Sequence, residues 1–227
     1  MKRKRILLIA AAALLIAAAV WGIAGRMSGN GAQTAQTTQD REETTAAKPV
    51  IYLYPSAETP VSVKLTLSGT PGTRYPAPDA DGVWRVTAQP DGTLTDAAGR
   101  EYSYLFWDGV LDTAYDFSKG FCVRGADTAA FLQETLAAMG LLPREYNEMI
   151  VYWLPQMENN AWNLISFQTD AYTEAAALEI EPAPDSLLRV FMAWKALPEP
   201  VWIEPQTVSP FVREGFAAVE WGGAQVR

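Results

Sequence analysis

The chain has 227 residues, enough for one domain with an N-terminal appendage. It contains no histidine and one cysteine, Cys122, which excludes Ser-His-Asp and Cys-His catalysis, histidine metal centres, an intramolecular disulfide and multi-cysteine clusters. The formal net charge of -8 hides an asymmetry, because residues 27–227 hold 13 Lys and Arg against 26 Asp and Glu. So acidic a surface repels phosphate backbones, and we expect no nucleic-acid partner.

The N-terminus has the pattern of a membrane anchor. Residues 6–24 are an uncharged, mainly Ala, Leu and Ile run whose helix would reach about 28 Å, one hydrocarbon thickness. Lys2, Arg3, Lys4 and Arg5 precede it and should stay cytoplasmic. We therefore predict a cytoplasmic basic tip and transmembrane signal anchor over 1–25, with the lipid bilayer as partner of residues 6–24. The alternative is a cleaved signal peptide, with Ala17-Ala18-Ala19 as the cleavage site, which would make the protein secreted.

Composition divides the rest of the chain into a stalk, a domain and a tail. Residues 26–48 hold no aromatic or branched aliphatic side chain and predict a disordered stalk. From Pro49 onward Trp, Tyr and Phe are frequent, so we place a β-rich globular domain at 49–223 and a short tail at 224–227.

Alternating apolar and polar residues predict strands through most of this domain. The clearest alternation is at 61–68, where Val61, Val63, Leu65 and Leu67 share one face. Turns are expected at 90–92 and 96–99, and the five prolines between 198 and 210 predict an extended segment. The predicted strands are 50–54, 61–68, 84–88, 101–107, 117–124, 149–154, 163–168, 177–181, 187–194 and a last one that contains Val219 and Trp221.

One segment has helical periodicity. Phe131, Leu132, Leu136 and Met139 recur at three- and four-residue steps, with Asp127 as N-cap and Gly140 as terminator. This predicts one main helix near 128–139, and residues 143–146 are a candidate start for a short second one. The fold class expected is therefore α+β and β-rich: a single compact extracytoplasmic domain of mainly antiparallel strands, preceded by an N-terminal transmembrane helix.

Three aromatic strings occur in order along the domain. They are KPVIYLYP at 48–55, EYSYLFW at 101–107 and YWLP at 152–155. Together they resemble an uncharacterised family of exported or membrane-anchored proteins, common in anaerobic gut Firmicutes, that opens with a KPVIYLYP-like string. The resemblance implies an exported domain over about 49–223, and it brings no activity, cofactor or catalytic residue.

The segment 153–162 is the most suggestive candidate binding site. Two indoles bracket a polar loop of amides and a carboxylate, the mixture that a sugar or peptide site uses. The opposing interpretation is a turn between strands whose Trp side chains lie in the core. The candidate ligand-binding residues are Trp153, Gln156, Glu158, Asn159, Asn160 and Trp162.

Three weaker constellations have ordinary structural explanations. Asp79-Ala80-Asp81-Gly82 is similar to part of a calcium loop but lacks its distal Glu, and a hairpin turn explains it. Tyr102, Tyr104 and Trp107 invite the same ligand idea as 153–162, yet an aromatic strand commonly fills a β core. A pair among the acidic residues near aromatics would suit glycoside cleavage, although solvated surface charge explains each singly. These acidic residues are Glu101, Asp108, Asp112, Asp116 and Glu158.

The sequence leads to three functional hypotheses. The first is a membrane-tethered extracytoplasmic binding module for envelope carbohydrate or peptide, without catalysis. The others are a carboxylate-dependent glycan hydrolase and a non-catalytic subunit of an envelope assembly that meets another envelope protein. We expect no metal and no cofactor.

Overall fold

The computed structural model describes residues 44–226. The predicted basic tip, the predicted anchor and most of the predicted stalk lie outside this part of the chain. None of the helices within 44–226 combines the length and the apolar character that crossing a bilayer requires.

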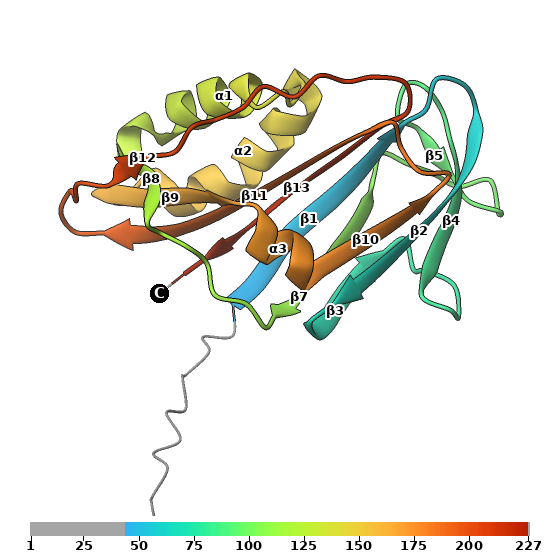
Figure 1. Cartoon of the computed structure of the whole chain (residues 1–227), viewed down its shortest axis with the longest axis horizontal. Helices are drawn as coiled ribbons and strands as arrows, with labels where there is room; N and C mark the ends of the chain where they lie inside the picture. The colour runs from blue at the N-terminus through green and yellow to red at the C-terminus, as the bar shows by residue number, and fades with distance from the viewer. Residues whose placement is uncertain (1–43, 227) are drawn as a thin grey trace, which may run out of the picture. The chain divides into compact units, whose positions relative to one another are not determined.

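Two β-sheets dominate the domain (Figure 1). All strand pairs in the described part are antiparallel except β11 with β13 and β12 with β8, which confirms the expectation of mainly antiparallel strands. The larger sheet has the order β12-β8-β9-β11-β13-β1-β7-β3, and the smaller one β10-β2-β4-β5-β6. Strands of the larger sheet are β1 (Thr44–Tyr54), β3 (Gly69–Tyr75), β7 (Leu105–Leu111), β8 (Lys119–Arg124), β9 (Trp162–Gln168), β11 (Ser186–Leu197), β12 (Glu204–Pro205) and β13 (Ala217–Gln225). Those of the smaller sheet are β2 (Thr59–Leu67), β4 (Val83–Ala88), β5 (Leu94–Thr95), β6 (Glu101–Tyr102) and β10 (Ala176–Glu181).

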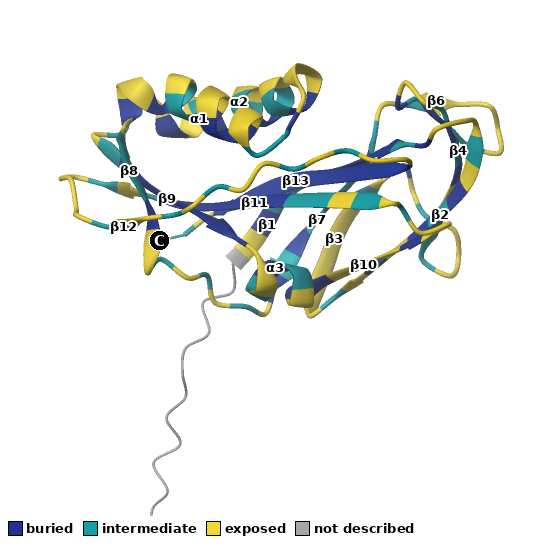
Figure 2. Ribbon diagram, turned by 45° about the horizontal axis from the view of Figure 1, so that its top comes forward, coloured by how far each residue is buried: buried dark blue, intermediate teal, exposed yellow. Residues whose placement is uncertain are grey.

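The larger sheet is covered on both faces, because successive side chains of a strand point to opposite sides. On β1, Ile51 and Leu53 enter a core shared with the smaller sheet, whereas Val50 and Tyr52 enter a second core beneath the helices. Figure 2 shows the result: β13 is buried along its length, and the helices are exposed on their outer side. The domain is thus a layer of helices, a central sheet and a second sheet.

Helices α1 (Thr128–Ala138) and α2 (Pro143–Met157) form the helical layer (Figure 1). The prediction of a helix near 128–139 is confirmed. It ends as expected: Gly140 has φ +98°, and the amide of Leu141 donates to the carbonyl of Leu136, the bond of a Schellman motif. A 3-10 turn (Gly125–Asp127) precedes α1, and a short helix α3 (Asp170–Ala175), which the sequence pattern did not indicate, precedes β10.

The prediction of a strand at 149–154 is wrong, because these residues belong to α2. Met149, Trp153 and Met157 are spaced by four residues, lie on one helix face and are buried against the larger sheet. Residues 149–154 are an unbroken apolar and aromatic run, and over six residues such a run fits a buried strand as well as part of a helix.

The predicted strand 101–107 is two strands in two sheets. Glu101–Tyr102 forms β6 of the smaller sheet, and Leu105–Leu111 forms β7 of the larger one. The chain changes sheets at 103–104, so Trp107 points into the core while Tyr104 stays half-buried. The edge strand β3, with two Gly and one Pro in seven residues, lacked any strand pattern.

The predicted domain boundaries shift at both ends. Residues 44–48, assigned to the stalk, are part of β1 and pair with β7 and β13. Ala224 and Gln225, assigned to the tail, complete β13, and Ala224 is buried. Both segments consist of small or polar residues whose order comes from sheet pairing, a long-range effect that local composition does not report.

Candidate functional site

The candidate site predicted at 153–162 is a junction between elements of the fold. Trp153 is 1% exposed and packs edge-on against Trp194, with ring centroids 6.3 Å apart. Gly223 makes room for it, since a Cβ there would lie 2.8 Å from Cζ2 of the indole. Trp153 is therefore a core residue, as the alternative interpretation expected, and its face is not available to a ligand.

The other predicted residues lie at the end of α2 and the start of β9. Gln156 is in the last turn of the helix, Glu158 and Asn159 are exposed just beyond it, and Trp162 is half-buried with the guanidinium carbon of Arg124 5.1 Å from its ring centroid. Asn160 Nδ2 donates to Oδ1 of buried Asn163 at 2.7 Å. Asn163 in turn donates to Thr128 and to the carbonyl of Met157. The amides of this segment thus join α1, α2 and β9.

An open hollow lies instead on the helix-side face of the larger sheet, between α2 and the edge strand β3. We call it the Tyr104 hollow, and its volume is about 690 Å³. Strands β1, β3 and β7 form its floor, and α2 contributes one wall. Its lining residues are Thr45, Ala47, Lys48, Thr73, Tyr75, Tyr104, Phe106, Asp108 and Tyr152.

The Tyr104 hollow combines aromatic rings with one cation and one anion. The ammonium of Lys48 lies 6.0 Å from the ring centroid of Tyr104 and 5.5 Å from that of Tyr152. Asp108 lies on β7, the strand next to β1, and accepts a hydrogen bond from the backbone amide of Thr73 on β3. Tyr104 and Tyr152 are half-buried, so part of each ring remains accessible.

Burial raises the pKa of both tyrosines, and nearby carboxylates add to the effect. The charge of Glu148 raises the pKa of Tyr104, and that of Asp108 raises the pKa of Tyr152. Both hydroxyls therefore stay protonated at neutral pH, so each offers one donor and lone pairs as acceptors beside an apolar ring face.

The three aromatic strings of the sequence meet in this hollow. KPVIYLYP contributes Lys48, EYSYLFW contributes Tyr104 and Phe106, and YWLP contributes Tyr152. The strings are far apart in the chain and come from β1, the sheet-changing segment with β7, and α2. The strings are evident in the sequence, but the predicted site includes the Trp of YWLP, Trp153. The Tyr that precedes it is the one that reaches the hollow.

A second hollow adjoins the first. It has a volume of about 720 Å³ and is lined by residues 74–79, 83–86, 96–98 and 100–102; we call it the Tyr102 hollow. The calcium-like string at Asp79 lies on its rim and forms the expected turn, with Asp79 Oδ1 accepting from the amides of Asp81 and Val83. Within residues 44–226 no group of three or more metal-ligating side chains comes together.

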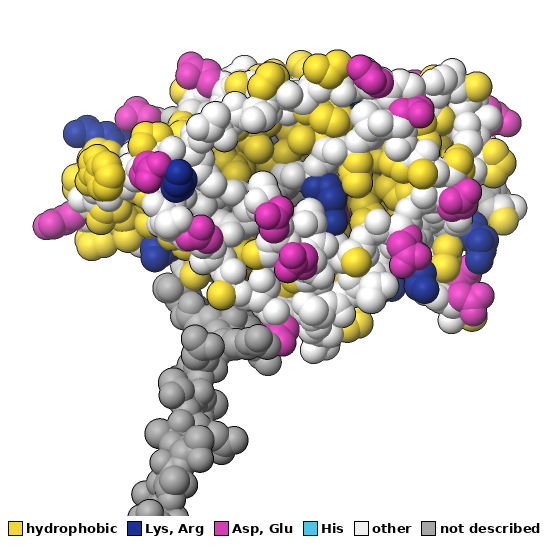
Figure 3. Space-filling model, viewed as in Figure 1, with side chains coloured by type: hydrophobic (Ala, Val, Ile, Leu, Met, Phe, Trp, Pro, Cys, Tyr) yellow, Lys and Arg dark blue, Asp and Glu magenta, His cyan; other side chains and the backbone are white. Residues whose placement is uncertain are grey.

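An apolar patch lies at the far end of the domain, beside β8 and β12, where Figure 3 shows hydrophobic side chains gathered. Phe121, Phe131, Val201, Trp202 and Ile203 contribute to it. Trp202 is 88% exposed and stands on the proline-rich segment. Its residues line neither hollow, which makes Trp202 a suitable control aromatic.

Comparison with known proteins adds a family but no activity. An uncharacterised protein of Butyrivibrio fibrisolvens, named for its place in the bglA 3′ region, is 41% identical over 88 residues, which make up 84% of that protein and 38% of this chain. The chain belongs to the family of that protein. No family model and no solved structure matches the chain.

Proposed function

We propose that this domain is a carbohydrate-binding module of the cell envelope and that the Tyr104 hollow is its ligand site. The observation that carries the proposal is the meeting of all three aromatic strings in one open hollow of about 690 Å³. This volume is in the usual range of about 300–1,000 Å³ for small-molecule sites. Peptide, the other ligand that the sequence suggested, is an outcome that the binding test below distinguishes.

The chemistry of the hollow suits a sugar ring. The C–H face of a pyranose stacks on an accessible aromatic ring, and Tyr104 and Tyr152 offer such rings from two sides. The ammonium of Lys48 can donate to sugar hydroxyls, and the carboxylate of Asp108 can accept from them. The two opposite charges leave the lining neutral, which suits an uncharged saccharide.

The hydrolase alternative has less support. Cleavage of a glycoside by two carboxyls needs one with a raised pKa, so that it holds a proton to donate. In the Tyr102 hollow the pKa values of Asp79 and Asp96 are lowered, chiefly by hydrogen bonds from the backbone amides of Val83 and Arg100. Asp116, one of the acidic residues that the sequence suggested for this reaction, also has a lowered pKa, because the amide and the hydroxyl of Ser118 donate to its carboxylate. The pKa values of all three carboxylates are therefore shifted in the direction opposite to that of a proton donor.

We also propose that the module works outside the membrane, tethered by residues 6–24 and the segment that follows. The apolar run and the basic residues before it support this placement. The family of the Butyrivibrio protein would then be the exported or anchored Firmicutes family that opens with a KPVIYLYP-like string. If the N-terminus is cleaved, the same module is secreted.

The test is a binding screen of the full chain in detergent against chito-, cello- and xylo-oligosaccharides, peptidoglycan fragments and proline-rich peptides. We expect a saccharide to bind and both Tyr104→Ala and Tyr152→Ala to weaken it at least tenfold. Trp202→Ala is the control and should bind like the wild type. If only peptides bind, the ligand class is peptide and not saccharide. If both Tyr variants bind the saccharide as tightly as the wild type, the Tyr104 hollow is not the ligand site.

A further inference from the structure

Tyr75 belongs to both hollows. It is the last residue of β3, at the edge of the larger sheet, and lines the Tyr104 hollow and the Tyr102 hollow alike. Its side chain is 61% exposed, unusually high for an aromatic residue at the end of a strand. The two hollows therefore adjoin each other at one exposed phenol ring, which lines both of them.

The aromatic surface continues from Tyr75 into the second hollow. The rings of Tyr75 and Tyr102 meet edge to face, with centroids 5.6 Å apart and planes at 80°. Tyr102 belongs to the smaller sheet, whereas Tyr104, two residues later, belongs to the first hollow. The change of sheet at 103–104 thus places one tyrosine in the lining of each hollow.

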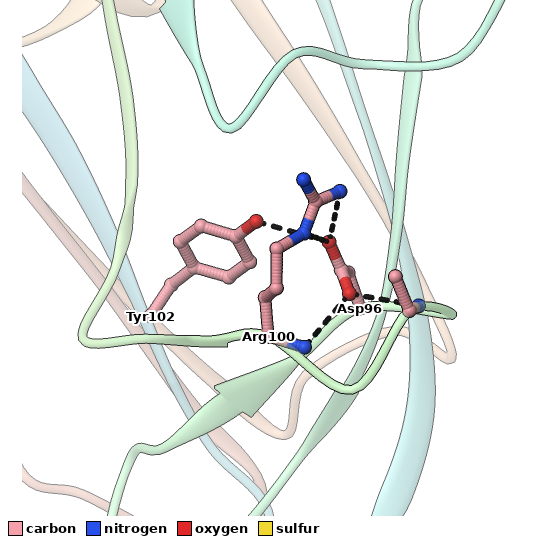
Figure 4. Close-up of polar contacts among 4 residues, drawn as sticks. Asp96, Arg100 and Tyr102 are labelled. Carbon is pink, nitrogen blue, oxygen red and sulfur yellow. Dashed lines mark hydrogen bonds and ion pairs between the residues drawn. The ribbon is translucent and has the colours of Figure 1, made fainter.

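Hydrogen bonds hold Tyr102 in place, as Figure 4 shows. Its hydroxyl donates to Oδ2 of Asp96 at 2.9 Å, and the side chain of Arg100 donates to the same oxygen at 2.8 Å. The other oxygen, Oδ1, accepts from the backbone amides of Ala98 and Arg100. A ring whose hydroxyl is fixed loses little conformational entropy when a ligand stacks on it.

The charges of the second hollow are balanced. Arg85 pairs with Asp79 and Arg100 with Asp96, and the guanidinium of Arg74 lies 5.8 Å from the ring centroid of Trp84. With Glu101, the lining holds three cationic and three anionic side chains. In a chain with a net charge of -8, a neutral groove rich in donors and acceptors fits an uncharged, hydroxyl-bearing chain better than a polyelectrolyte.

We propose that the two hollows form one groove that binds a linear, uncharged β-linked oligosaccharide across Tyr75. The inference rests on the proposed function and specifies its ligand: a chain of several sugars, not a mono- or disaccharide. Each hollow alone has the volume of a site for one small ligand, so a short sugar occupies one and leaves the other empty. β-1,4-linked chains are extended and present their C–H faces along their length, which suits rings placed in succession.

The test uses the full chain in detergent with two probes, the disaccharide and the hexasaccharide of β-1,4-linked N-acetylglucosamine, and calorimetry as readout. We expect the hexasaccharide to bind at least tenfold more tightly than the disaccharide. Tyr75→Ala and Tyr102→Ala should each reduce this ratio severalfold, and Tyr104→Ala should weaken both probes. The control Trp202→Ala should leave both affinities unchanged. Tyr75 is exposed at a strand end, so its variant should fold even if Tyr102→Ala does not.

The outcomes separate this inference from the proposed function. If both probes bind with equal affinity and Tyr75→Ala leaves the ratio unchanged, the groove ends at Tyr75. The inference then fails while the proposed function stands. If neither probe binds, the inference of a β-1,4-linked oligosaccharide ligand fails, and the wider screen of saccharides and peptides decides the proposed function.

Discussion

Arg189 on β11 and Glu220 on β13 form an ion pair inside the core between the two sheets. Arg189 Nε donates to Oε2 of Glu220 at 2.6 Å, and the two side chains are 8% and 0% exposed. Trp107 on β7 donates from Nε1 to the other carboxylate oxygen at 3.0 Å. One buried carboxylate thus joins the parallel pair at the centre of the larger sheet to β7.

Removal of the Glu220 carboxylate alone should destabilise the fold more than removal of both partners of the ion pair. We expect Glu220→Leu to lower the free energy of unfolding by about 3–5 kcal/mol, because it leaves the Arg189 charge buried and unpaired. The double variant Arg189→Met with Glu220→Leu should regain part of that loss, although Trp107 still lacks its acceptor. Urea unfolding followed by tryptophan fluorescence measures all three proteins. A double variant less stable than the single one would contradict the argument.

The start of β1 at Thr44 leads to a prediction about truncation. Residues 44–47 pair with β7 and β13, so a fragment that begins at Pro49 lacks the first residues of β1, an inner strand of the larger sheet. We expect the fragment 40–227 to fold alone and to melt several degrees above 49–227. Circular dichroism melting curves compare the two. Equal melting temperatures would show that residues 44–48 add nothing to the sheet.

How much of this fold the sequence predicts depends on where the stabilising contacts come from. At 61–68 and 128–139 the apolar periodicity of the segment agrees with the burial of its residues in the folded domain, and the predictions of a strand and a helix are confirmed. At 149–154 an unbroken apolar run fits a buried strand as well as a helix, and packing against the larger sheet decides for the helix. The edge strand β3 has no pattern at all, since pairing with β7 alone defines it.

The candidate site shows the same limit. Residues of the Tyr104 hollow come from β1, β3, the sheet-changing segment at 103–104, β7 and α2, so no window of sequence contains it. The paired indoles at 153 and 162 were the stronger local signal, yet helix geometry turns Trp153 into the core and Tyr152 toward the hollow. A signal was present in the order of the three aromatic strings, but their meeting point required the topology of the larger sheet.

The buried and exposed tryptophans should respond differently to truncation. Trp153→Ala removes a core side chain and should lower the free energy of unfolding by about 3–5 kcal/mol. Trp202→Ala alters an 88% exposed side chain and should change it by less than about 0.5 kcal/mol. Chemical denaturation measures both. A stable Trp153→Ala protein would place that indole outside the core and restore the site predicted at 153–162.

Asp96 should titrate at an unusually low pH. The amide of Arg100, the hydroxyl of Tyr102 and the Arg100 side chain stabilise the carboxylate and lower its pKa from 3.8 to about 2. Since the folded pKa lies below the unfolded one, Asp96 stabilises the fold fully above about pH 4, and this contribution is lost as pH falls toward 2. Carbon-13 NMR of the Asp96 carboxyl follows the titration, with Tyr102→Phe as the variant that raises the midpoint. A midpoint near 3.8 in the wild type would contradict the network.

Lys48 combines a strained backbone with a place in the Tyr104 hollow, and two variants separate these properties. Its φ is +52°, a region where a Cβ costs about 1–2 kcal/mol. Lys48→Gly and Lys48→Ala both remove the ammonium near Tyr104 and Tyr152, but only glycine relieves the strain.

We therefore expect Lys48→Gly to be more stable than Lys48→Ala by about 1 kcal/mol in urea unfolding. The glycine variant should stay close to the wild type, because the entropy of glycine in the unfolded chain and the lost contacts of the ammonium with the rings offset the relief of strain. Both should bind the N-acetylglucosamine hexasaccharide severalfold more weakly than the wild type and equally weakly as each other, because the missing donor is the same. If Lys48→Ala matched Lys48→Gly in stability, the positive φ would not constrain this position. If both variants bound the sugar like the wild type, the ammonium would have no part in the ligand site, and the strained conformation at residue 48 would serve only the bulge between β1 and its two neighbours.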